Sequence, residues 1–178
     1  HLLPLLDWAM PVYGRRAYLT GSNYIWGWEM NRLARETITA AGGAVLGERY
    51  LPIGSLEIGR MIEEIRVTRP DFILNSLIGP SSYRFLAALA ELAAQDPAFA
   101  AGRCPVLSCN MTECELPALG AAAEGLIAMS GQFEQRRALD LVRRVGEDRR
   151  NQGRRRFGKE PLQALAPGDL DLLPPAVQ

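Results

Sequence analysis

The chain has 178 residues, of which 48% are hydrophobic and 22% charged, a balance typical of a globular protein with a real core. Its 20 basic and 20 acidic residues give a formal net charge of zero, so no global field favours nucleic acids or acidic substrates. A single histidine, His1, excludes Ser-His-Asp and Cys-His catalytic arrangements within this chain.

The first predicted element is a helix over residues 2–13. Its apolar face carries Leu2, Leu5, Leu6, Ala9 and Met10. The first residues lack the basic region and cleavage motif of a signal peptide, and they resemble a helix already under way. We therefore expect the chain to be one lobe of a longer polypeptide.

Short apolar strands then alternate with helices. We predict strands at 16–21, 44–52, 72–76, 106–109 and 125–130, and helices at 27–41, 58–67, 81–94 and 113–119. Gly42-Gly43 and Arg69-Pro70 end two of these helices. Strand starts spaced by about thirty residues are typical of βα units, which build a parallel sheet with helices on both faces. The predicted fold class is α/β, a three-layer α/β/α arrangement with a mostly parallel sheet.

The character of the chain changes after residue 133. We assign residues 1–133 to the α/β lobe, 134–160 to a basic helical segment and 161–178 to a Pro-rich tail, extended or disordered. The basic segment contains ten of the 20 Lys and Arg residues, and it is either a solvated amphipathic helix or a surface for a partner. Nucleic acid is the least favoured partner, because only Phe133 and Phe157 stand among these cations.

The sequence carries no motif for a metal or a nucleotide cofactor. Cys104, Cys109 and Cys114 follow a C-x4-C-x4-C spacing, which predicts free thiols and not a zinc site or a disulfide framework. Neither a P-loop nor a G-x-G-x-x-G motif follows the first strand. The pair Glu63-Glu64 is expected to be solvated on a charged helix face. We expect no cofactor, no metal and no enzymatic activity.

Three predicted strands end in polar loops, at Gly21–Trp26, Asn75–Gly79 and Ser108–Thr112. Carboxyl ends of parallel strands form the edge where open α/β sheets bind ligands. Aromatic walls with a few aimed polar groups are the usual make-up of a small-ligand pocket. The candidate ligand-binding residues are Tyr24, Trp26, Ser76, Gly79, Thr112 and Glu113.

Each candidate ligand-binding residue also has a purely structural interpretation. Tyr24 and Trp26 either face a crevice from an extended loop or pack against the first helix as local core. Ser76 and Thr112 either offer hydroxyls to a ligand or cap their loops. Glu113 and Glu115 flank a helix start, where a carboxylate is stabilised by the helix dipole and the free N–H groups.

Four motifs resemble, in order and spacing, the second lobe of type I periplasmic-binding-protein folds. They are Gly21-Ser-Asn-Tyr-Ile-Trp26, the stretch Gly42–Ser55, Pro70-Asp-Phe-Ile-Leu-Asn-Ser76 and Pro105-Val-Leu-Ser-Cys-Asn-Met-Thr-Glu113. The resemblance covers residues 2 to 130 and is nearest to the amide- and urea-binding branch. That branch holds solute-binding components of ABC transporters and a cytosolic amide sensor that controls amidase expression.

The resemblance implies a two-lobed protein that closes on its ligand about a hinge. It implies aromatic contacts from Tyr24 and Trp26, and polar contacts from Ser76, Gly79, Thr112 and Glu113. The sequence departs from the family at Asn23, where Asp is usual, at Gly27, where Pro is frequent, and at Ser130–Phe133, where an aromatic-rich strand end is expected.

The resulting hypothesis is a lobe that binds a small polar solute, a short-chain amide or urea, against a first lobe of the same protein. As a transporter component it would be periplasmic and would meet ABC transporter membrane subunits. The alternative is a cytoplasmic amide sensor that acts through a regulatory protein partner. An α/β enzyme with its catalytic residues elsewhere, and self-association as a homo-oligomer, stay open.

Overall fold

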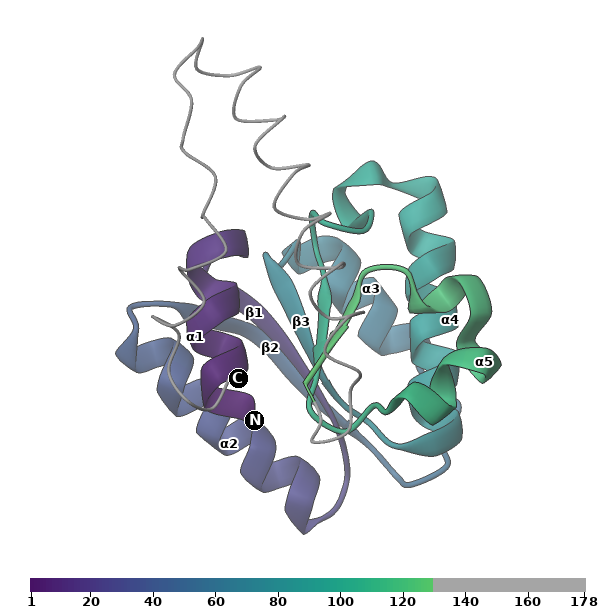
Figure 1. Ribbon diagram of the computed structural model, residues 1–178, viewed down its shortest axis with the longest axis horizontal. Helices are drawn as coiled ribbons and strands as arrows, with labels where there is room; N and C mark the ends of the chain where they lie inside the picture. Colours follow the sequence, from purple (N-terminus) through teal and green to yellow (C-terminus); the bar gives the residue numbers. More distant parts are fainter. Residues whose placement is uncertain (130–178) are drawn as a thin grey trace, which may run out of the picture. The chain divides into compact units, whose positions relative to one another are not determined.

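The computed structural model describes residues 1–129. Within this part the chain forms ten helices and strands that alternate in sequence (Figure 1). These are α1 (Leu2–Tyr13), β1 (Arg16–Ser22), α2 (Ile25–Ala40), β2 (Ala44–Leu51), α3 (Gly59–Thr68), β3 (Phe72–Ser76), α4 (Gly79–Gln95), β4 (Val106–Ser108), α5 (Leu116–Leu119) and β5 (Leu126–Ala128). Short 3-10 turns cover Pro97–Phe99, Glu113–Glu115 and Gly120–Ala123. The predicted segments 134–160 and 161–178, and the strand end at Ser130–Phe133, lie outside the described residues.

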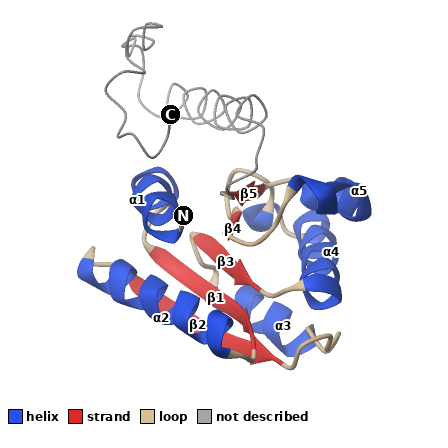
Figure 2. Cartoon of the chain, turned by 60° about the horizontal axis from the view of Figure 1, so that its bottom comes forward, coloured by secondary structure: helices blue, strands red, loops and turns tan. Residues whose placement is uncertain are grey.

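The five strands form one sheet in the order β2-β1-β3-β4-β5, and every neighbouring pair is parallel. From β1 the chain moves to β2 on one side, then returns past β1 to β3, β4 and β5 on the other. Right-handed crossovers put α2 on one face and α3 and α4 on the opposite face. Figures 1 and 2 show this division, with α1 packed beside α2. The predicted three-layer α/β/α fold with a parallel sheet is confirmed.

Two helices begin two residues earlier than predicted. Tyr24 is extended, with φ −157° and ψ 172°, and caps α2, so Trp26 lies in the first turn of the helix and not in a loop. Gly27 permits this close approach, because a Cβ at Gly27 would come within 2.2 Å of the Ser22 carbonyl oxygen. Pro80 stands in the first turn of α4, where a missing N–H costs no helical hydrogen bond.

No helix in the described part of the chain is both long enough and apolar enough to cross a membrane. The main core lies between the sheet and the α3/α4 layer. Tyr18, Ile73, Met61, Ile65 and Phe85 meet there, each at most 1% exposed. All five residues of β3 are buried, as expected for a central parallel strand.

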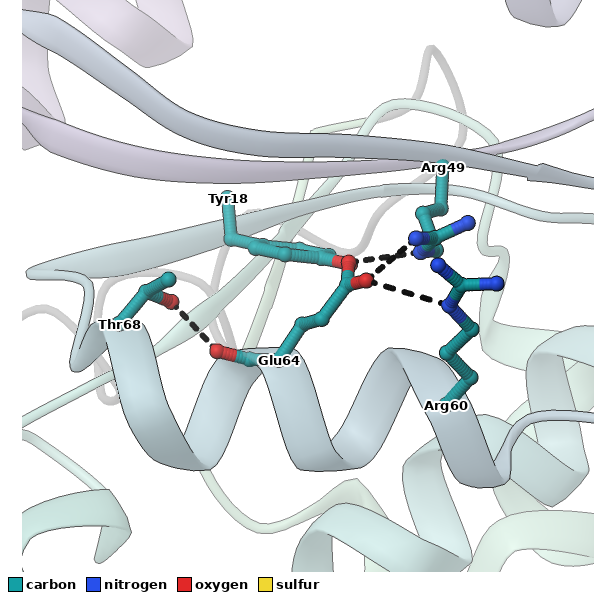
Figure 3. A network of polar contacts seen from close by, with 5 residues as sticks. All are labelled: Tyr18, Arg49, Arg60, Glu64 and Thr68. Atoms are coloured by element: carbon teal, nitrogen blue, oxygen red, sulfur yellow. Dashed lines mark hydrogen bonds and ion pairs between the residues drawn. The ribbon is translucent and has the colours of Figure 1, made fainter.

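The edge strand β2 is only half-buried and is joined to its neighbours by charged side chains (Figure 3). The Tyr18 hydroxyl donates to Glu64 Oε2 at 2.8 Å, and Arg49 Nε donates to the same oxygen at 2.6 Å. Arg60 approaches the other carboxylate oxygen at 3.5 Å. Glu64 was expected to be solvated; it is instead 32% exposed and connects α3 to β1 and β2. Neighbouring Glu63 is 61% exposed and pairs with Arg66 on the same helix.

Gly47→Ala should destabilise the fold. A Cβ at Gly47 would lie 2.5 Å from Tyr18 Cε2, and Tyr18 is fully buried, so its ring has no free space to enter. We expect a loss of about 1–3 kcal/mol in the free energy of unfolding, measured by urea titration. Gly59→Ala is the control, because no atom lies within 4 Å of its added Cβ. Equal stability of the two variants would contradict this packing.

The contribution of Glu64 should depend on pH. Hydrogen bonds from Arg49 lower the pKa of the Glu64 carboxyl from its ordinary 4.5 to about 2. Because the folded-state pKa is the lower one, the stabilisation is complete above about pH 4.5 and is lost as the pH falls towards 2. Glu64→Gln should cost about 1 kcal/mol at pH 7, and the difference from wild type should shrink between pH 5 and pH 3.

Urea unfolding at pH 7, 5 and 3 measures this difference. Glu63→Gln is the matched control, since its carboxylate is exposed and, among the described residues, pairs with Arg66 alone. A Glu64→Gln effect that stays constant with pH would contradict the assignment.

Candidate functional site

The candidate site lies where the chain leaves two neighbouring strands in opposite directions. After β1 it turns towards β2, and after β3 it turns towards β4. The loops that follow β1 and β3 therefore separate at the carboxyl edge, and such a switch point is the usual ligand crevice of an open α/β sheet. Ser22 and Tyr24 follow one strand, and Leu77 to Gly79 follow the other.

Tyr24 and Trp26 form the aromatic part of this edge. Their rings are stacked, with centroids 6.4 Å apart and an interplanar angle of 26°, and both side chains are half-buried. Trp26 also lines an apolar hollow of about 360 Å³ together with Met30, Leu33 and Cys109 and with the first turn of α1. Trp26 therefore stacks with Tyr24 and also lines a hollow that it shares with the first turn of α1.

The connection between β3 and α4 forms the second part of this edge. Ser76, at the end of β3, is 2% exposed and lies inside the lobe. Gly79 opens α4 with φ +55°, and a Cβ there would meet no atom of residues 1–129 within 4 Å. The first-turn N–H groups of α4 have no partner within the helix, so the backbone at Gly79 is open to a ligand. The Ser76 side chain, which is buried, is not open to a ligand.

Thr112 lies in the connection after β4 and is half-buried. Glu115 accepts hydrogen bonds from the Thr112 backbone N–H at 2.8 Å and from its hydroxyl at 3.2 Å. The Tyr83 hydroxyl donates to the same carboxylate at 3.0 Å, which raises the pKa of Tyr83. The N–H and the hydroxyl of Thr112 are therefore both bound to the Glu115 carboxylate. Glu113 begins the 3-10 turn, and its side chain lies outside the described part of the structure.

Sequence reasoning missed a buried polar group behind this edge. Asn75 is fully buried; its Oδ1 accepts from the Thr20 hydroxyl at 3.0 Å and its Nδ2 donates to Ser82 Oγ at 2.8 Å. The Ser82 hydroxyl in turn contacts Met111 Sδ at 3.5 Å. A buried asparagine at a strand end, with Thr and Ser on the neighbouring elements, was the available signal for this network.

The described residues include one histidine and three cysteines as potential metal ligands or nucleophiles. They contain no cluster of three His, Cys, Asp or Glu side chains placed to hold a metal ion. The three cysteines are free thiols, and burial raises the pKa of Cys109 to about 11 and of Cys104 to about 12. A separate cavity of about 310 Å³ opens at the opposite, amino edge of the sheet, beside Cys104, and includes none of the predicted site residues.

Residues 1–137 match the family model described as periplasmic binding protein domain. Among solved structures, the chain is similar to a solute-binding protein of an ABC transporter from Rhodopseudomonas palustris HaA2 in complex with p-hydroxybenzoic acid. The identity is 23% and the TM-score 0.61, over 82% of this chain and 40% of the other.

A branched-chain amino acid ABC transporter periplasmic ligand-binding protein from Burkholderia xenovorans LB400 is also similar. It is 14% identical with a TM-score of 0.57, over 90% of this chain and 40% of the other. The chain therefore spans about 40% of the length of these two structures. At such identities the likeness shows a shared fold.

Proposed function

Because this chain belongs to the periplasmic binding protein domain family, we propose that it is one lobe of a two-lobed solute-binding protein. The observation that carries the proposal is the carboxyl edge, where the Tyr24–Trp26 pair follows β1 and the open backbone at Gly79 follows β3. Such an edge can bind and orient a solute without reacting with it. A first lobe would complete the site, and closure on the ligand would signal occupancy.

The first ligand class that we propose is a short-chain amide or urea. The Gly79 N–H can donate to a ligand, and the Thr112 hydroxyl, which donates its own proton to Glu115, can still accept from one. Stacked rings can cover the flat face of a small planar molecule. A ligand of about four heavy atoms, at a ceiling near 1.5 kcal/mol each, gains about 6 kcal/mol, which corresponds to a Kd of some tens of micromolar. Half of the site should bind far more weakly.

The second ligand class is a hydroxybenzoate-like aromatic acid. The apolar hollow beside Trp26 is large enough for a ring, and the structure from R. palustris HaA2 holds p-hydroxybenzoic acid. Both similar structures are described as ABC transporter proteins, which favours transport over the sensor role. The proposed partners are accordingly the membrane subunits of such a transporter, and the proposed location is the periplasm.

Titration calorimetry on the complete two-lobed protein tests the ligand. Acetamide, urea, 4-hydroxybenzoate and leucine are added in turn, and we expect saturable heat with an amide or with the benzoate. Trp26→Ala should weaken that binding at least about tenfold, because it removes one ring of the stacked pair.

Trp28→Ala is the matched control on the same helix. Trp28 is 45% exposed, and its indole N–H donates to Asn23 Oδ1 at 3.0 Å outside the hollow, so its loss should leave affinity unchanged. Equal losses in the two variants would contradict the site, and saturation with leucine alone would contradict both ligand classes.

A further inference from the structure

The connection between β3 and α4 is only two residues long, and its backbone is held by side chains from three strand ends. The Leu77 N–H donates to Asn75 Oδ1 at 3.2 Å, and the Ile78 N–H donates to Ser22 Oγ at 3.1 Å. The Leu77 carbonyl accepts from Asn110 Nδ2 at 2.7 Å. Asn75 is the last residue but one of β3, Ser22 ends β1, and Asn110 follows β4.

The orientation of both amide groups follows from their backbone partners. A carbonyl oxygen can only accept, so the nitrogen of Asn110 must face Leu77. A backbone N–H can only donate, so the oxygen of Asn75 must face the same residue. The Ser108 hydroxyl donates to Asn110 Oδ1 at 2.6 Å, and this bond holds the other end of the same amide group. Leu77 itself is fully buried, and therefore water cannot replace these bonds.

We propose that Asn110 is a positioning residue of the ligand edge: its bond to the Leu77 carbonyl joins the loop after β4 to the turn after β3, and Ser22 joins that turn to β1. The inference rests on the proposed function, because it concerns the same edge. The three loops then form one preformed unit that presents the Gly79 backbone in a fixed place. Preformed sites bind more tightly because less ordering is needed when the ligand arrives.

Asn110→Asp tests this role with almost no change in shape. The introduced carboxylate still accepts from Ser108, but it cannot donate to the Leu77 carbonyl and repels it. Hydrogen exchange, followed by NMR on the 178-residue chain without ligand, should speed up at least about tenfold at the Leu77 and Ile78 amides. Amides in the middle of β1 should be unaffected.

Asn23→Asp is the matched control. It makes the same chemical change at the same edge, but Asn23 uses its oxygen, which aspartate keeps, to accept from Trp28. Unchanged exchange in Asn110→Asp, equal acceleration in both variants, or fast exchange of these amides already in wild type would overturn the proposal.

Affinity measurements distinguish a failure of this inference from a failure of the proposed function. In the complete two-lobed protein, Asn110→Asp should weaken binding of acetamide or 4-hydroxybenzoate about tenfold while the thermal midpoint stays close to that of Asn23→Asp. Accelerated exchange with unchanged affinity would overturn the positioning role. If wild type binds none of the four solutes, the proposed function fails, and the exchange result still decides whether Asn110 holds the turn.

Discussion

The connection between the buried strand β3 and the helix α4 consists of Leu77, which is fully buried, and Ile78, which is half-buried. Buried backbone polar groups need partners inside the protein. At Leu77 and Ile78 these partners are side chains from the ends of β1, β3 and β4. The same contacts hold the loops after these three strands to one another at the carboxyl edge. Gly79, which follows at once, has a positive φ and open space around it, and so brings free backbone to that edge.

Most of the architecture could be predicted from local pattern. The run Phe72–Ser76 is wholly apolar except at its polar end, and it forms β3 with the predicted bounds. Thirty-residue spacing between strand starts predicted parallel pairing, because each crossover needs a helix. The predicted starts of α2 and α4 are two residues late. The prediction has Trp26 in a loop with the next helix beginning at Gly27, and it has the later helix beginning after Pro80, whereas Trp26 and Pro80 both lie in the first turn of their helices.

The site was predictable only in part. The sheet edge after β1, β3 and β4 follows from topology. Tyr24 and Trp26 were expected to share an extended loop, and they stack instead with Trp26 in the first turn of α2. The contacts that hold the edge join residues far apart in sequence: Ser22 and Ile78 are separated by 56 positions, and Leu77 and Asn110 by 33. Local pattern carries no information about such pairs. It also could not show that Ser76 turns inward or that Thr112 pairs with Glu115.

The central claim is that the carboxyl edge is the ligand face of this lobe. Amide chemical-shift mapping on the 178-residue chain, with acetamide or 4-hydroxybenzoate added to millimolar concentrations, tests it directly. We expect perturbations at Tyr24, Trp26, Gly79 and Thr112. The claim would be contradicted by perturbations that gather instead at the amino edge, around Leu89 and Cys104. It would also be contradicted by the absence of any perturbation at about 50 mM ligand, because even weak half-site binding would be seen at that concentration.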